Sequence, residues 1–128
     1  MRYFLSAERK ELDWEVNVDR TVALLDGLEL SFNTRMRQAE GRYFGSGEVS
    51  YEVRVLSKQE AEYVARLAFD RFDQESMLEV APDNRANLVY ADGRREYVGI
   101  WTRVSEAVAK AKDCWTRIGN QYYVTVLE

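Results

Sequence analysis

Alternation of apolar and polar residues is the feature that most constrains the fold of this chain. Three early segments show it: residues 12–18, 28–36 and 49–55. Because successive side chains of a strand point to opposite faces, this pattern predicts half-buried strands. A short helical turn, capped by Asp19, is expected between the first two. The second and third runs are predicted to form one long hairpin with its loop at residues 38–47.

Helical spacing replaces the alternation in two places. Ser57 and Glu60 have the three-residue spacing of a capping box, which marks the start of a helix. Ala61, Ala65 and Phe72 then recur on one stripe, as in a helix that packs against a sheet. We therefore expect a main helix at about 57–73, and a short one near 105–112 that Ser105 caps.

Two-residue turn signals organise the C-terminal half. Asp92-Gly93 and Gly119-Asn120 each separate two strand-like runs, which predicts two hairpins. The chain has 128 residues, 46% of them hydrophobic, and no internal linker, so it fits one domain, residues 1–128, with its own core. The expected fold is α+β: a largely antiparallel sheet with the main helix packed on one face.

Missing residue types exclude most common chemistry. The chain has no histidine, which removes Ser-His-Asp and Cys-His nucleophiles and histidine metal sites. Its single cysteine, Cys114, cannot form an internal disulfide or a cysteine-based zinc site. No phosphate-binding or calcium-binding loop is present. We therefore expect no catalytic residues, no metal and no cofactor. The alternative is a carboxylate- or metal-dependent enzyme built on Asp70, Asp73 and Glu75.

Net charge and targeting signals restrict the classes of partner and the location that are expected. The net charge is −4, without the basic stripe typical of a nucleic-acid binder, so nucleic acid is the weaker partner hypothesis. No apolar run is long enough to span a membrane, and the N-terminus lacks the apolar segment of a secretory signal. The expectation is a cytoplasmic protein with no membrane partner.

Two groups of aromatic and arginine residues are candidate binding surfaces. The first lies in the loop EGRYFGSGE, where Arg42, Tyr43 and Phe44 stand between Gly41 and Gly45. Loops lie at the surface, so these side chains either dock into a partner or fold back over the core. The second comes from the repeated tetrad Trp-Thr-Arg-aliphatic, which contributes Trp101 and Arg103, and again Trp115 and Arg117.

The function favoured by these residues is a non-catalytic protein-interaction module. Tyr, Trp and Arg are enriched at interfaces, and the chain has fourteen arginines to four lysines, although a GC-rich genome would also favour arginine. Small inhibitor proteins of phages and mobile elements, such as anti-CRISPR proteins, share this size and character, but no motif identifies a family. Another protein is the expected partner, and the same face would also serve self-association. The alternatives are a small-ligand or nucleic-acid binder using aromatic strands, and a metal- or carboxylate-dependent enzyme.

Overall fold

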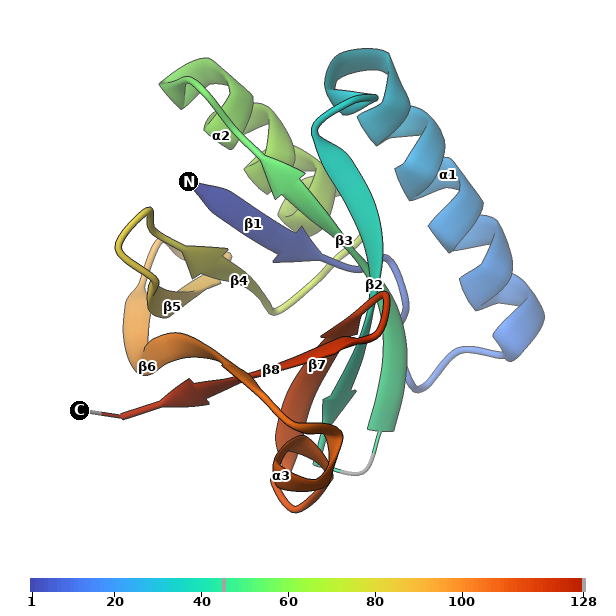
Figure 1. The fold of residues 1–128 in the computed structure, drawn as a ribbon. Coiled ribbons are helices and arrows are strands. Elements are labelled where there is room, and N and C mark those ends of the chain that lie inside the picture. Colours follow the sequence, from blue (N-terminus) through green and yellow to red (C-terminus); the bar gives the residue numbers. More distant parts are fainter. Residues whose placement is uncertain (45, 128) are drawn as a thin grey trace.

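The computed structural model describes residues 1–44 and 46–127, whose strands form a closed antiparallel barrel (Figure 1). Two helical segments cover one side of it, and a short helix lies at one end. In chain order the elements are β1 (Arg2–Leu5), α1 (Trp14–Phe32), β2 (Met36–Tyr43), β3 (Ser46–Arg54), α2 (Lys58–Ala65) continued by the π-helical η1 (Arg66–Arg71), β4 (Ser76–Val80), β5 (Arg85–Tyr90), β6 (Arg95–Val104), α3 (Glu106–Lys110), β7 (Cys114–Ile118) and β8 (Gln121–Val126).

Strand pairing closes the ring in the order β1-β3-β2-β7-β8-β6-β5-β4, with β4 returning to β1. The long strand β6 bends from β5 to β8, and its register against β5 shifts at Ala86 and Asn87. Gly99 lies at this bend with φ +123°, and a Cβ atom there would come 2.5 Å from the carbonyl oxygen of Val126. Such a bulge at a glycine bends a strand and increases its twist, which allows one strand to serve two neighbours.

Two apolar cores lie on opposite faces of the β1–β3 pair. Outside the barrel, α1 and α2–η1 pack on β1 and β3 through Leu24, Leu28, Phe32, Val53 and Val64. Inside the barrel the core consists of Phe4, Ala39, Val80, Ala86, Trp101 and Ile118. The strands under the helices are therefore apolar on the outside and line the barrel on the inside.

The predicted open α+β sheet is wrong, because the strands close into an eight-stranded barrel. The predicted main helix exists as α2 and η1, but it shares the outer face of the barrel with the longer α1 (Figure 1). Closure gives the sheet an inner face as well as an outer one. The residues that an open sheet would expose to water are for this reason partly buried.

The segment predicted as two strands joined by a helical turn is the helix α1. Leu24, Leu28 and Phe32 are buried at four-residue spacing, which is the spacing of one helix face. Trp14 and Val18, which belonged to the supposed alternation, are 73% and 48% exposed. The alternating apolar residues of this segment do not become buried as a set. The residues at four-residue spacing do, so the segment folds as a helix.

The capping prediction for the second helix is confirmed. Ser57 Oγ accepts a hydrogen bond from the backbone N–H of Glu60 at 3.1 Å, and the Glu60 carboxylate accepts one from the N–H of Leu56 at 2.8 Å. Both guanidinium Nη atoms of Arg35 hold the same carboxylate, at 2.8 and 2.7 Å, which lowers the pKa of Glu60 to about 2. Ser105 likewise caps α3. In the described part of the chain no helix has the length and apolarity needed to cross a bilayer.

Candidate functional site

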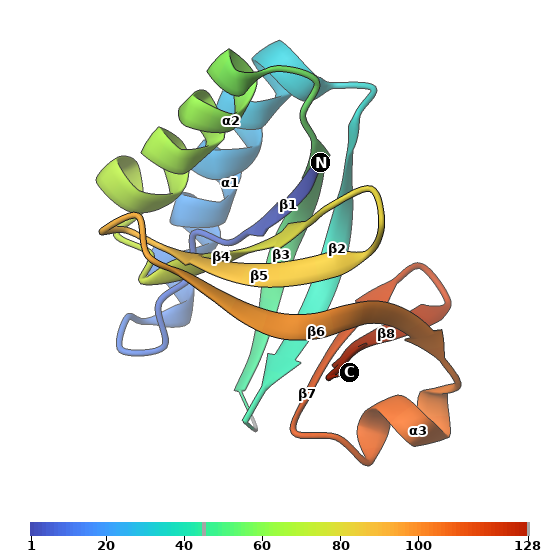
Figure 2. The ribbon, with the colours of Figure 1, turned by 90° about the vertical axis from the view of Figure 1, so that its left-hand side faces the viewer.

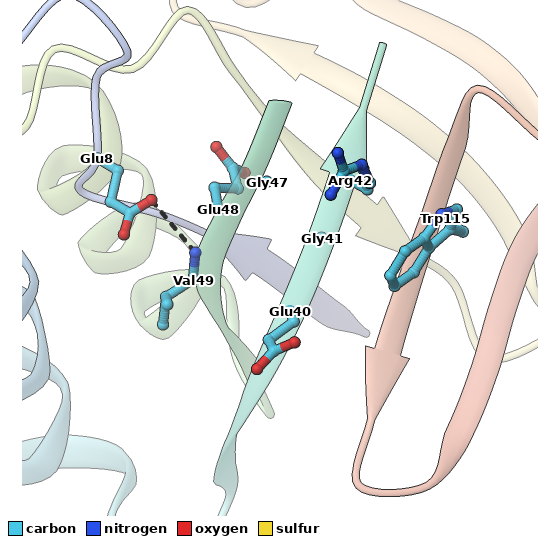
Figure 3. A pocket seen from close by; sticks show the side chains of 8 residues that line it. All are labelled: Glu8, Glu40, Gly41, Arg42, Gly47, Glu48, Val49 and Trp115. Carbon is cyan, nitrogen blue, oxygen red and sulfur yellow. Dashed lines mark hydrogen bonds between the residues drawn. The ribbon is translucent and has the colours of Figure 1, made fainter. Parts of the chain in front are cut away.

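A cleft of about 260 Å³ lies where the β2–β3 hairpin meets β7 and the segment that follows β1 (Figure 3). The hairpin tip and α3 lie at the same end of the barrel, away from α2 (Figure 2). The cleft, called here the acidic cleft, is lined by Glu8, Glu40, Gly41, Arg42, Gly47, Glu48, Val49 and Trp115. Three carboxyl groups line the cleft, and Arg117 from outside the lining pairs with Glu40. Glu8 and Glu48 are therefore the two that could attract a cationic ligand.

A wider depression of about 450 Å³ lies along the C-terminal half of α1. It is lined by Asp26, Glu29, Leu30 and Asn33, all of them exposed. Four exposed residues from one stretch of helix bring no distant groups together. The depression is open surface, and the acidic cleft is the candidate site.

Strand register places Glu48 at the end of the barrel wall. Glu48 lies opposite Gly41, and Gly41 lies opposite Thr116 on the other side of β2. Because directly opposed residues share a face, Glu48 and Thr116 belong to the inner face. The pairing of β1 with β3 begins only at Tyr51, so Glu48 stands beyond the end of β1.

Partial burial gives Glu48 an unusual acidity. Burial raises the pKa of Glu48 to about 7, and the neighbouring carboxylate of Glu8 adds to the shift. A carboxyl group with this pKa exists in both protonation states near neutral pH. Carboxyl groups tuned in this way are concentrated at functional sites.

Tyr43 lies close to Glu48 on the inner face. Its hydroxyl is 3.3 Å from Thr116 Oγ1. Burial raises the pKa of Tyr43 to about 12, and the charge of Glu48 contributes. The phenol therefore stays protonated and keeps its hydrogen-bond donor beside the carboxyl group of Glu48.

The barrel interior also holds polar atoms that lack a partner among residues 1–44 and 46–127. These are Ser50 Oγ and Trp101 Nε1, both buried. Ser50 is two residues from Glu48 on the same strand, so both side chains are on the inner face. A buried hydroxyl without a partner costs free energy, and a bound polar group would satisfy it.

The two predicted surfaces meet at the acidic cleft through Arg42 and Trp115, which are directly opposed on β2 and β7. Arg117, on the same face as Trp115, forms an ion pair of 2.6 Å with Glu40. These residues came from the loop and from the second tetrad. The structure thus joins one residue of the first predicted surface to two residues of the second.

The other predicted residues lie elsewhere. Phe44 is 81% exposed at the hairpin tip, whereas Tyr43 turns to the inner face. Gly45, part of the predicted loop, is outside the described residues. Trp101 is stacked on Tyr123 inside the barrel, with ring centroids 5.1 Å apart and planes at 9°.

Register also separates the two tetrads. Arg103 is exposed and lies opposite Tyr123, which also lies opposite Thr116. It therefore belongs to the inner face, whereas Trp115 and Arg117 belong to the outer face. The two Trp-Thr-Arg sequences face opposite sides of the barrel and do not form one surface.

Sequence reasoning missed Glu8, Glu48 and Ser50. In the third alternating run the pattern predicts that Val49, Tyr51 and Val53 form the buried side, and that the polar residues between them face water. The signal was present, because Glu48, Ser50 and Glu52 form a polar row on the second face of that strand. In a closed barrel this row faces the interior, and Ser50 and Glu52 are buried.

The proposed acidic cluster of Asp70, Asp73 and Glu75 does not form a metal site. Among the residues whose placement is described, no group of three or more Asp, Glu or Cys side chains is arranged to hold a metal ion. The carboxylates that converge are those of the acidic cleft.

The acidic cleft, with the carboxyl group of Glu48 tuned to neutral pH beside Glu8, is a candidate site for a small cationic ligand. The sequence profile of the S-Adenosylmethionine lyase family matches residues 3–126. The match covers nearly the whole chain, and the protein belongs to this family. No curated protein matches the chain at a significant level.

Proposed function

We propose that the protein is a lyase that cleaves S-adenosylmethionine in the acidic cleft. The observation that carries the proposal is the family match over residues 3–126, combined with Glu48 at the cleft. S-adenosylmethionine bears a sulfonium, an ammonium and a carboxylate, so its net charge is positive. The excess of carboxylates in the cleft complements that charge.

Individual side chains suit the parts of this substrate. Glu48 and Glu8 suit the two cations of the substrate. Trp115 and Arg42 line the cleft from the outer face of β7 and β2, on the opposite side of the barrel wall from the side chain of Glu48. At about 260 Å³ the cleft is slightly smaller than the range of about 300 to 1,000 Å³ found for small-molecule sites. The substrate would therefore be only partly enclosed.

The absence of histidine favours a route without proton transfer. In such a route the substrate's own carboxylate oxygen bonds to its γ carbon while the carbon–sulfur bond breaks. A lactone and neutral methylthioadenosine result, and no atom is gained or lost. The protein would hold the methionine part of the substrate in the geometry that this reaction needs. Glu48 would lie at the cations, and the protonated Tyr43 hydroxyl would be a fixed hydrogen-bond donor.

The test is incubation of the purified protein with S-adenosylmethionine, followed by chromatography of the nucleosides. We expect the substrate to disappear and methylthioadenosine to appear in equal amount, while S-adenosylhomocysteine stays intact. Unchanged S-adenosylmethionine after prolonged incubation with folded protein would refute the proposal.

A role as a phage-type inhibitor is compatible with this activity. Removal of S-adenosylmethionine would deprive methyltransferases of their methyl donor, and methylation-dependent defence would fail with them. Contact with a protein partner remains a separate hypothesis. It is supported by Phe44, whose ring is largely exposed at the hairpin tip.

A further inference from the structure

We infer that Glu8 is the residue by which the acidic cleft selects a sulfonium cation over the neutral thioether of the same nucleoside. The inference deepens the proposed function and rests on it. It assigns a specificity-determining role to a side chain outside the barrel strands, in the segment that follows β1.

Glu8 is held at the edge of β3 by three hydrogen bonds. Its backbone N–H donates to Ser6 Oγ at 3.1 Å, and its carbonyl oxygen accepts from Gln74 Nε2 at 3.1 Å. Its carboxylate accepts from the backbone N–H of Val49 at 3.3 Å, one residue from Glu48 (Figure 3). The carboxylate is therefore fixed beside Glu48 rather than free to turn into solvent.

The charge of Glu8 is available to a ligand. Arg9, the nearest base in sequence, is engaged with the carboxylate of Glu11 and the carbonyl oxygen of Asp73. In the described part of the chain no ion pair includes Glu8 or Glu48. Glu40, the third carboxylate of the cleft, is already paired with Arg117 at 2.6 Å.

A buried hydroxyl without a partner in the described part of the chain lies on the same strand as Glu48, two residues away. Ser50 Oγ is buried on the face that carries Glu48, and it has no hydrogen-bond partner among residues 1–44 and 46–127. The carboxyl groups of Glu8 and Glu48, which both line the cleft, repel each other. A cation bound between the carboxylates would relieve the repulsion, whereas a neutral sulfur would not.

The preference for a cationic over a neutral sulfur can be tested with two nucleosides. S-adenosylmethionine and S-adenosylhomocysteine share the adenine, the ammonium and the carboxylate, and differ in one methyl group and one positive charge at sulfur. Contacts to the shared groups are common to both nucleosides. Discrimination between them must come from the carboxylates that face the sulfur.

The decisive variant is Glu8→Gln, which keeps an oxygen acceptor for the N–H of Val49 and removes only the charge. Affinity is measured by calorimetry, or as kcat/KM where S-adenosylmethionine is cleaved, with S-adenosylhomocysteine as the neutral competitor. We expect the value for S-adenosylmethionine to fall about tenfold, and that for S-adenosylhomocysteine to change by less than about twofold. Carbon NMR of the Glu48 carboxyl should also show a lower pKa, since one neighbouring charge is gone.

The matched control is Glu15→Gln, which removes an exposed carboxylate in the first turn of α1, outside the acidic cleft. The ratio of its affinities for S-adenosylmethionine and S-adenosylhomocysteine should stay within about twofold of the wild-type ratio. Equal losses for both nucleosides in Glu8→Gln, or no change in either, would overturn the inference while leaving wild-type cleavage intact. A wild-type protein that binds neither nucleoside would remove the proposed function and the inference together.

Discussion

The ring of Tyr43 lies over Gly41 so closely that a Cβ atom on Gly41 would come 2.4 Å from Tyr43 Cε2. The two residues are neighbours on the inner face of β2, and the missing side chain leaves room for the phenol. The tyrosine can therefore turn into the barrel and bring its hydroxyl to Thr116.

Gly41→Ala should displace this ring and impair the site. We expect cleavage of S-adenosylmethionine to fall at least tenfold, with a loss of stability of about 1–3 kcal/mol, the usual cost of overpacking. Gly47→Ala is the matched control, because the nearest atom to its new Cβ is 3.9 Å away. Kinetics and urea unfolding of both variants provide the check, and full activity in Gly41→Ala would show that the ring position is unimportant.

Glu48→Gln should stabilise the protein in a pH-dependent way. The folded-state pKa of Glu48, about 7, lies above its ordinary value of 4.5, so the protonated side chain favours folding at low pH. That contribution is present below about pH 4.5 and is lost as the pH rises through 7. At pH 8 the variant should be more stable by about 1–2 kcal/mol, after allowance for partial solvent exposure, and at pH 4.5 by almost nothing. Thermal unfolding at the two pH values measures this, and an equal gain at both would contradict the shifted pKa.

Gly99→Ala should unfold the barrel more readily than any ordinary surface change. The substitution combines a left-handed backbone, φ +123°, with a Cβ atom 2.5 Å from the carbonyl oxygen of Val126, and we expect a loss of at least about 3 kcal/mol. Gly93→Ala serves for comparison, since its φ is +87° but no atom lies within 4 Å of the new Cβ. That variant should lose about 1–2 kcal/mol, the cost of the left-handed backbone alone. Similar losses in both would mean that the β6 bend does not depend on close approach.

Phe44→Ala separates partner binding from catalysis. The ring is exposed, so its removal should change stability by less than about 0.5 kcal/mol and leave cleavage of S-adenosylmethionine unchanged. If the hairpin tip binds a protein, the variant should lose that partner in affinity capture from cells that express it. Retention of every partner of the wild type would refute the docking hypothesis for this residue.

Local signals allowed part of the fold to be predicted. The Ser57–Glu60 cap and the two-residue turn at Gly119-Asn120 depend on residues a few positions apart, and both appear as expected. The hairpin around Asp92-Gly93 also forms, but with a three-residue turn, because the N–H of Tyr90 bonds to the carbonyl oxygen of Arg94. Closure of the barrel depends instead on pairs such as Arg2 with Val80 and Arg42 with Trp115. These partners are more than seventy residues apart and carry no local signature, so the sheet was expected to stay open.

The lack of a local signal for strand closure also explains why Glu8, Glu48 and Ser50 were not predicted as site residues. Aromatic residues near Gly41 pointed to the hairpin whose residues line the acidic cleft, because exposed rings in a loop are unusual. Glu48 belongs to the polar side of an alternating strand, which an open sheet turns toward water. Only closure, together with the placement of Glu8 by Gln74 and Val49, makes that side a candidate site.

The most direct test of the account is the pH dependence of S-adenosylmethionine cleavage in the wild type and in Glu48→Gln. If the carboxylate of Glu48 holds the substrate cations, wild-type kcat/KM should rise between pH 6 and pH 8 with a midpoint near 7, the pKa of Glu48 in the free protein. Glu48→Gln should be at least about a hundredfold slower at pH 8 and show no such rise. A variant that cleaves S-adenosylmethionine at the wild-type rate would contradict the assignment of the acidic cleft as the active site.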